Sequence, residues 1–169
     1  MSTTPKRQPN PARALVWPKN WEQLQGAAIA ALREGTQVPE LEADESGDVP
    51  IRYGSAGLWV RVNRGIPQIA IYSCVLLDVE ATPALLEALN ELNAQHRPAT
   101  FYLYKSVVVA ATELDCAPFN PPALLRALQF LAHLVDEVDE DLSLRFGGRT
   151  GLQEARSSGG TGAAPQRAN

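Results

Sequence analysis

The segment from Tyr72 to Gly148 constrains the fold most, because its hydrophobic pattern alternates between strand-like and helix-like. The strand-like run Tyr72-Ser-Cys-Val-Leu-Leu-Asp precedes the amphipathic stretch Leu85-Leu-Glu-Ala-Leu-Asn-Glu-Leu-Asn93. The apolar run Val107-Val-Val-Ala-Ala-Thr-Glu113 follows, and then a second amphipathic stretch that leads into Phe146-Gly-Gly148. Hydrophobic recurrence at the helical period favours helices, and short apolar runs favour strands. The segment therefore predicts a strand, a helix, a hairpin and a helix in one module.

Upstream of this segment, the sequence predicts one helix and three strands. Asn20 is a suitable N-cap for a helix over residues 21–34, and Gly35 is a suitable stop. The strands are predicted at residues 49–53, 58–63 and 68–78, with the turn 54–57 closing the first hairpin. In the second strand Leu58, Val60 and Val62 alternate with more polar or aromatic residues, which gives it one aliphatic face.

Two further helices are marked by a cap residue followed by proline, a pattern typical of helix starts. Thr82 and Pro83 open a helix that ends near Gln95, and Asn120 with Pro121 opens the last helix. Strands are predicted at residues 100–104 and 106–114. Because only Lys105 separates them, the pair forms either a hairpin, which we favour, or one long bent strand.

The last helix has an apolar stripe formed by Leu124, Leu128, Leu131, Val135 and Val138. Two further leucines, Leu125 and Leu134, widen this stripe.

The resulting order, α-β-β-β-α-β-β-α, predicts an α+β domain in which an antiparallel sheet packs against helices. We expect this domain to span residues 18–149. Both termini contain few large apolar residues, so they cannot bury enough surface to offset the entropy of ordering them. We therefore expect disordered tails at residues 1–17, which are basic and proline-rich, and at residues 150–169, which are rich in Gly, Ser and Ala.

The charge balance argues against a nucleic-acid partner. Five of the 15 basic residues, but only one of the 19 acidic residues, lie in the tails, so the predicted domain carries a net charge of −8. A phosphate backbone requires clustered Lys and Arg.

The two cysteines, Cys74 and Cys116, are interpreted as buried reduced thiols. No apolar run is long enough for a signal peptide or a membrane span, which predicts a cytoplasmic protein without a membrane partner.

The sequence offers little material for catalysis or for cofactor binding. No glycine-rich phosphate loop is present, and Gly147-Gly148 is interpreted as a helix or strand terminator. His96 and His133 lack metal-ligand spacing, so no metal and no cofactor are expected. Cys74 with His96 lacks an orienting third group. Asp78 and Glu113, each near the end of a strand, could lie close together, but they do not define a catalytic pair. No enzyme is predicted.

The most distinctive surface is the non-aliphatic face of the predicted sheet. It would gather Trp59, Arg61, Tyr72, Tyr102 and Tyr104. One interpretation is a second hydrophobic core under a helix. The other is a groove or dimer surface for another polypeptide, because aromatic residues and arginine are enriched at the centres of interfaces. Leu125 and Leu134, which widen the stripe of the last helix, are further candidates for partner binding.

The acidic run from Asp136 to Asp141 is the nearest approach to a cation site. It lacks the alternating oxygen ligands and the central glycine of a calcium loop. It is interpreted as a solvated helix end, and the alternative is a contact for a basic partner. Carboxylates near a helix C-terminus oppose the helix dipole.

The element order, the strings quoted above and the pairs Leu89-Asn90 and Leu92-Asn93 resemble the actinobacterial branch of the YbjN and type III secretion chaperone-like superfamily. The resemblance covers residues 17–149. It implies the same α-β-β-β-α-β-β-α domain, often a homodimer, which binds an unfolded or extended segment of another protein without catalysis.

Together these observations predict a non-catalytic, chaperone-like module that binds a protein or peptide client and forms a homodimer. Two alternatives remain at this point. One is a small-molecule-responsive regulatory domain or cryptic enzyme with a pocket between sheet and helices, and the other is a structural subunit of a larger assembly. The sequence does not identify the client.

Overall fold

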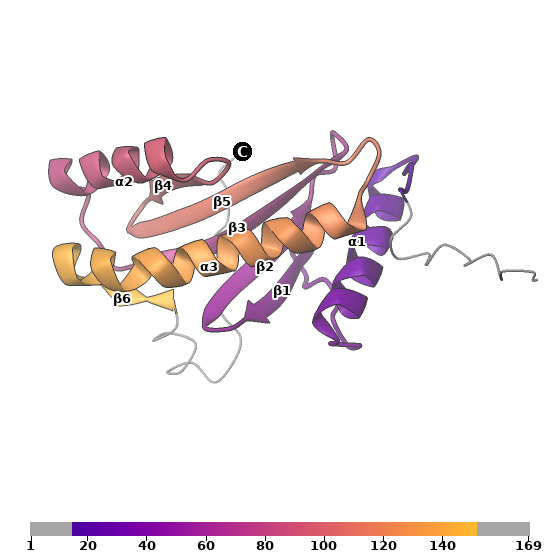
Figure 1. Cartoon of the computed structure of the whole chain (residues 1–169), viewed down its shortest axis with the longest axis horizontal. Coiled ribbons are helices and arrows are strands. Elements are labelled where there is room, and N and C mark those ends of the chain that lie inside the picture. The colour runs from indigo at the N-terminus through magenta and orange to yellow at the C-terminus, as the bar shows by residue number, and fades with distance from the viewer. Residues whose placement is uncertain (1–14, 152–169) are drawn as a thin grey trace, which may run out of the picture.

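The computed structural model describes residues 15–151, and most of both predicted tails lies outside this range. The elements confirm the predicted order and fold class, with a short strand added at the end (Figure 1). They are α1 (Trp21–Thr36), β1 (Asp48–Tyr53), β2 (Ala56–Val62), β3 (Gln68–Leu77), α2 (Pro83–Gln95), β4 (Thr100–Tyr104), β5 (Val107–Asp115), α3 (Pro121–Phe146) and β6 (Arg149–Thr150).

The strands form one antiparallel sheet in the order β1-β2-β3-β5-β4, and β6 pairs with the end of β3. Figure 1 shows α3 lying lengthwise along the sheet, with α1 at one end and α2 beside β4 at the other. Buried residues from each of the three helices belong to a single core cluster with the aliphatic face of β2 and its neighbours. The helices therefore cover one face of the sheet, and the main core lies between them and that face.

The predicted helix starts are confirmed in atomic detail. The side chain of Asn20 accepts a hydrogen bond from the backbone of Gln23 at 3.0 Å, and Thr82 accepts one from Leu85 at 3.2 Å. Each bond satisfies one of the backbone donors that a helix leaves unpaired in its first turn. Asn120 caps α3 in the same way.

The predicted stop of the first helix at Gly35 is wrong by two residues, because α1 continues through Gly35 to Thr36 and is capped by Gln37 in a left-handed conformation. Gly35 serves packing instead. A β-carbon at this position would lie 2.4 Å from Cδ2 of Leu125 on α3. The missing side chain lets the two helices approach, which the sequence pattern cannot distinguish from a helix stop.

The two glycines of α1 should respond differently to replacement by alanine. At Gly26, where a β-carbon would meet nothing within 4 Å, alanine should stabilise the protein by about 1 kcal/mol because of its higher helix propensity. At Gly35 the same gain is opposed by a clash with Leu125, and overpacking costs roughly 1–3 kcal/mol. Urea denaturation should thus rank Gly26→Ala above wild type and Gly35→Ala below it. Equal stabilisation by both would contradict the packing role.

The β1–β2 and β4–β5 hairpins each turn through two residues. The β4–β5 hairpin is confirmed, with Tyr104 paired to Val107 and the turn at Lys105 and Ser106. Lys105 adopts a φ of 56°, as such a tight turn requires. In the β1–β2 hairpin Tyr53 pairs with Ala56, so the predicted four-residue turn is wrong and only residues 54–55 lie outside the strands.

The chain after α3 returns to the sheet. Gly147 and Gly148 have φ values of 73° and 83°, which confirms their predicted role as terminators. A β-carbon on Gly148 would lie 2.4 Å from the backbone oxygen of Leu77. This close approach lets β6 pair with β3, where Arg149 binds Asp78 through two nitrogens at 2.6 and 2.8 Å.

Ordered pairing extends slightly beyond the predicted domain limits of 18–149. Val16 exchanges two backbone hydrogen bonds with Phe119, at 2.7 and 2.9 Å. At the other end, Thr150 pairs with Leu76 and is buried.

Candidate functional site

The face of the sheet opposite the helices carries a second hydrophobic cluster. Tyr72, Val109 and Ala111 are buried, and they are surrounded by three partly buried side chains, Trp59, Tyr102 and Val107. All six residues come from strands β2 to β5, and none comes from a helix. We call this surface the aromatic face. Of the two interpretations made from sequence, a second core under a helix does not fit the described residues.

The strand register explains why these side chains meet. Trp59 pairs with Tyr72, Tyr72 with Ala111, and Tyr102 with Val109. Residues directly opposite each other in an antiparallel pair point to the same side of the sheet. The rings of Trp59 and Tyr72 are stacked, with centroids 5.8 Å apart and planes inclined by 15°. The predicted gathering of aromatic residues is therefore present.

A polar network lies at the β1 side of the aromatic face. Asp48 is fully buried and is held by two nitrogens of Arg61 and by the hydroxyl of Tyr72, which donates at 2.7 Å. The guanidinium of Arg61 also lies 5.5 Å from the centre of the Tyr72 ring. A buried carboxylate has a large desolvation cost unless it is paired and hydrogen-bonded, and this geometry provides both.

The network also fixes protonation states. Hydrogen bonding to Asp48 raises the pKa of Arg61, so the guanidinium stays charged. Burial, followed by the hydrogen bond to Asp48, raises the pKa of Tyr72. The phenol is therefore a neutral hydrogen-bond donor at physiological pH and not a base or a nucleophile. The network is suited to positioning side chains on the aromatic face.

One polar group of the aromatic face is unsatisfied. The indole nitrogen of Trp59 is buried and has no hydrogen-bond partner. Buried donors are normally paired, and an exception calls for an explanation.

The predicted site residues separate into two groups. Trp59, Arg61, Tyr72 and Tyr102 come together on the aromatic face. Tyr104 follows at the end of β4 on the same side, where the Lys105 ammonium lies 5.3 Å from its ring centre.

The two leucines of α3 lie elsewhere. Leu134 is buried in the main core at 4% exposure and offers no surface to a partner in this conformation. Leu125 is half-buried and packs against the same core, next to Gly35. Neither contributes to the aromatic face.

Each edge of the sheet is blocked at one or two positions by the chain itself. At the β4 edge, the side-chain amide of Asn93 accepts from the backbone nitrogen of Phe101 at 2.6 Å and donates to its oxygen at 2.9 Å. At the β1 edge, Asp44 bonds both backbone groups of Asp48, at 2.8 and 3.0 Å. Pro50, the next edge position with the same orientation, has no backbone donor. These features disfavour the addition of a foreign strand at either edge.

The structure corrects the expectation that Asp78 and Glu113 lie close together. The strands β3 and β5 are antiparallel, so their C-terminal ends lie at opposite ends of the sheet. Glu113 is exposed and pairs with Ala70, whereas Asp78 follows β3 at the other end and binds Arg149. The two acids therefore cannot form a pair.

The cysteines and histidines are likewise placed apart from any reactive cluster. Cys116 is buried, but Cys74 is only half-buried, contrary to expectation. Burial raises the pKa of Cys116 to about 11, so its thiol is protonated at neutral pH. The ring of His133 lies edge-on to Tyr53, with centroids 6.2 Å apart. Within residues 15–151, no group of three His, Cys, Asp or Glu side chains could hold a metal ion.

The acidic run lies along α3 and does not form its end, since the helix continues to Phe146. Asp136 accepts a hydrogen bond from the hydroxyl of Ser55 in the β1–β2 turn, and Asp141 pairs with Arg145 at 3.1 Å. Burial raises the pKa of Asp139. Part of the run is thus used internally, to hold the hairpin against the helix.

None of the helices in the described range is long and apolar enough to cross a bilayer.

Comparisons with known proteins agree with the resemblance inferred from sequence. Among solved structures, the chain is similar to one described as "Crystal Structure of the ExsC-ExsE Complex", with 15% identity and a TM-score of 0.59, covering 71% of this chain and 93% of that one. It is also similar to one described as "Structure of the HopA1-SchA Chaperone-Effector Complex", with 14% identity and a TM-score of 0.55, covering 69% and 94%. At these identities the likeness shows a common fold.

No curated protein sequence matches the chain. A family model, in contrast, matches residues 22–154, which is most of the sequence. Its description is "T3SS (YopN, CesT) and YbjN peptide-binding chaperone 1". The match includes every described helix and strand apart from the first residue of α1. The chain therefore belongs to the TY-Chap1 family of peptide-binding chaperones related to YbjN and to those of type III secretion.

Proposed function

We propose that this protein is a non-catalytic chaperone that holds an extended segment of a client protein on the aromatic face. The observation that carries the proposal is a hydrophobic cluster on the side of the sheet that holds none of the described helices. Large apolar clusters at a protein surface commonly mark binding sites for other polypeptides. Family membership and the fold shared with two chaperone complexes support this choice. The protein acts in the cytoplasm.

The blocked edge positions support binding on the face. A peptide that adds as a strand needs a row of free backbone donors and acceptors. Asn93 occupies these groups at Phe101, Asp44 occupies those of Asp48, and Pro50 has no backbone donor. A client on the aromatic face instead contacts side chains from four strands, with Trp59 and Tyr102 as its largest apolar contacts.

We also propose that the functional form is a homodimer. Leu86 on α2 is 51% exposed, on the helix that lies beside the edge strand β4. An exposed leucine next to a sheet edge is suited to burial against a second copy. Light scattering measures this state directly and should give twice the mass of one chain.

The client site is tested with point variants and a matched control. Trp59→Ala and Tyr102→Ala should each weaken binding of a client by about tenfold or more, since aromatic anchors at an interface centre contribute about 2 kcal/mol or more. The client is first identified by cross-linking and mass spectrometry in the native host, and its affinity is then measured by calorimetry. Phe130→Ala is the control, because Phe130 is an exposed aromatic residue on α3.

Unchanged affinity in both aromatic-face variants would show that the client binds elsewhere. A greater loss in Phe130→Ala would point to the helical side of the molecule. A protein that is strictly monomeric and binds no partner would exclude the chaperone proposal altogether.

A further inference from the structure

The described chain ends at the margin of the aromatic face. Cys74 on β3 pairs with Val109 of this face, so its side chain points to the same side of the sheet. Gly151 follows β6, and a β-carbon built on it would lie 2.5 Å from the backbone oxygen of Cys74. The chain therefore continues from a position in contact with β3, next to the aromatic side chains.

The two termini start from different sides of the sheet. Val16 exchanges backbone hydrogen bonds with Phe119 and packs against the main core, which lies on the helix side. Residues 152–169, which we call the C-terminal segment, instead follow Gly151 beside the aromatic face. An extended chain spans about 3.3–3.6 Å per residue, and neighbouring strands lie about 4.8 Å apart. The C-terminal segment is thus long enough to cross a face built from four strands.

The aromatic face changes from apolar to acidic along β5. Ala111, Glu113 and Asp115 occupy alternate positions of this strand and therefore point to the same side of the sheet. Ala111 is buried among the aromatic residues, whereas Glu113 and Asp115 are exposed. The strand β4 begins opposite Ala111, so it does not extend beside the two acids. A segment that crosses the face from Cys74 toward them meets apolar side chains first and carboxylates afterwards.

The C-terminal segment has apolar and basic residues in this order. Leu152 is its only large apolar residue and comes directly after Gly151; the family match includes it. Arg156 stands five positions after Gly151, a reach of about 17 Å when extended. Between Cys74 and the partner of Glu113, β3 advances four positions, about 13 Å, and β5 lies about 4.8 Å farther. An extended segment can therefore bring the guanidinium of Arg156 to the acidic end of the face.

Building on the proposed client site, we infer that the C-terminal segment covers the aromatic face of its own chain when no client is bound. Leu152 packs on the aromatic side chains next to Cys74, and Arg156 faces the carboxylates of Glu113 and Asp115. Exposed ion pairs contribute little to binding. The tether compensates, because it raises the effective concentration of the segment to the order of millimolar. A client with more apolar residues displaces the segment.

Zero-length cross-linking of the full chain without a client tests this contact. Arg156→Lys keeps the positive charge and supplies an amine that carbodiimide couples to an adjacent carboxylate. Mass spectrometry should find position 156 joined to Glu113 or Asp115. A mixture of isotopically labelled and unlabelled protein shows whether the link forms within one chain, as we expect. Added salt should lower its yield, since salt screens charges at the surface.

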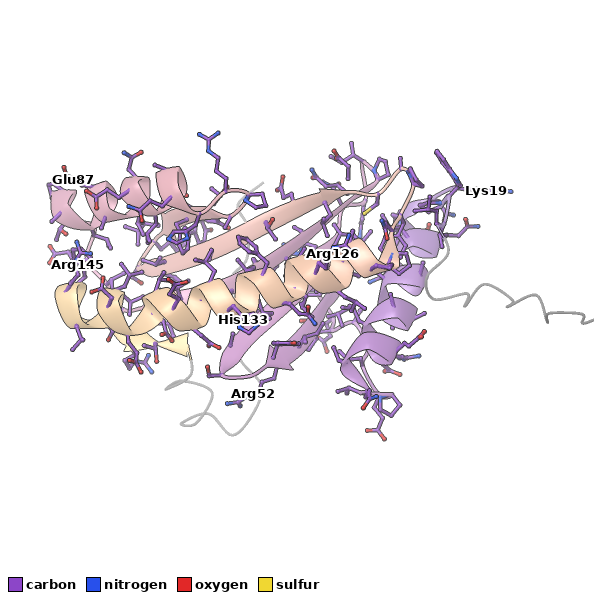
Figure 2. All side chains as sticks on the ribbon, in the orientation of Figure 1. Lys19, Arg52, Glu87, Arg126, His133 and Arg145 are labelled. Atoms are coloured by element: carbon purple, nitrogen blue, oxygen red, sulfur yellow. The ribbon has the colours of Figure 1, made fainter. Side chains whose placement is uncertain are left out.

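Two variants make the cross-linking specific. Glu113→Gln combined with Asp115→Asn should abolish the link at position 156. Glu87→Gln is the matched control and should leave the yield unchanged. Glu87 is also exposed, but it lies on α2, which covers the opposite side of the sheet (Figure 2). Links only between different chains, or links from Lys6 to the same two acids, would assign the face to a second copy or to the N-terminal residues and would overturn the inference.

The effect on client binding is measured with the full chain and the client identified as described above. Leu152→Ser combined with Arg156→Glu should strengthen client binding by about fivefold, because the fraction of chains with a covered face lowers the apparent affinity. Arg167→Glu makes the same change of charge eleven positions later and should alter the affinity by less than about twofold.

The cross-linking needs no client, so the failure of this inference can be distinguished from the failure of the proposed function. If position 156 forms no link to either acid while Trp59→Ala still weakens client binding, the C-terminal contact is wrong and the client site stands. If the link forms but Leu152→Ser with Arg156→Glu leaves client affinity unchanged, the client binds elsewhere. That result would overturn both the displacement of the segment and the proposed client site.

Discussion

Replacing Asp48 with alanine should lower the free energy of unfolding by about 3 kcal/mol. The variant leaves the guanidinium of Arg61 without its buried partner and the hydroxyl of Tyr72 without its acceptor. Removing one member of a buried ion pair typically costs about 3–5 kcal/mol. We expect the lower end of that range, because the side chain of Arg61 is 27% exposed and can regain some hydration. Urea denaturation followed by tryptophan fluorescence measures the loss.

Two variants serve as controls for Asp48→Ala. Asp115→Ala removes an exposed carboxylate at the end of β5 and should change stability by less than about 0.5 kcal/mol. The double variant Asp48→Ala with Arg61→Met removes both charges and should be more stable than Asp48→Ala alone, since an apolar replacement of a whole pair is often neutral. A single variant within about 1 kcal/mol of wild type would show that the network contributes little to the fold.

The polar network was missed from the sequence because the turn that sets its register was predicted two residues too long. A predicted turn over residues 54–57 shifts the pairing between β1 and β2, and it leaves Asp48 outside the first strand. With the observed two-residue turn, Tyr53 pairs with Ala56 and Asp48 falls opposite Arg61. Register follows from turn length. A two-residue turn at residues 54–55 would have placed Asp48 opposite Arg61, and this pairing of opposite charges would have indicated the network.

The helix caps and the aromatic face were predictable because they depend on local pattern. Asn20, Thr82 and Asn120 act within one helical turn, and Trp59 and Tyr102 follow from alternation along a strand. Features that depend on tertiary contact were not. Gly35 has the sequence signature of a helix stop, yet its role is set by Leu125, which lies ninety positions along the chain.

The apolar stripe of α3 shows the same limit. Leu125 and Leu134 both widen the stripe, and the pattern alone cannot say which side a second element covers. In the structure α3 packs on strands β2, β3 and β5 and also on α1. Leu134 is thereby enclosed at 4% exposure, while Leu125 stays half-buried. These contacts decide how far each leucine is exposed, and therefore whether it can contact a partner.

Replacing Leu134 with alanine should therefore destabilise the protein by about 2–5 kcal/mol, the range for deleting a buried leucine side chain and leaving a cavity. The matched control is Leu86→Ala on α2, where the leucine is 51% exposed and alanine is an equally good helix former. Its effect should stay within about 0.5 kcal/mol in the monomer. Both are measured by urea denaturation at low protein concentration. A Leu134→Ala variant as stable as Leu86→Ala would mean that this leucine is accessible in solution, and it would restore Leu134 as a candidate for partner binding.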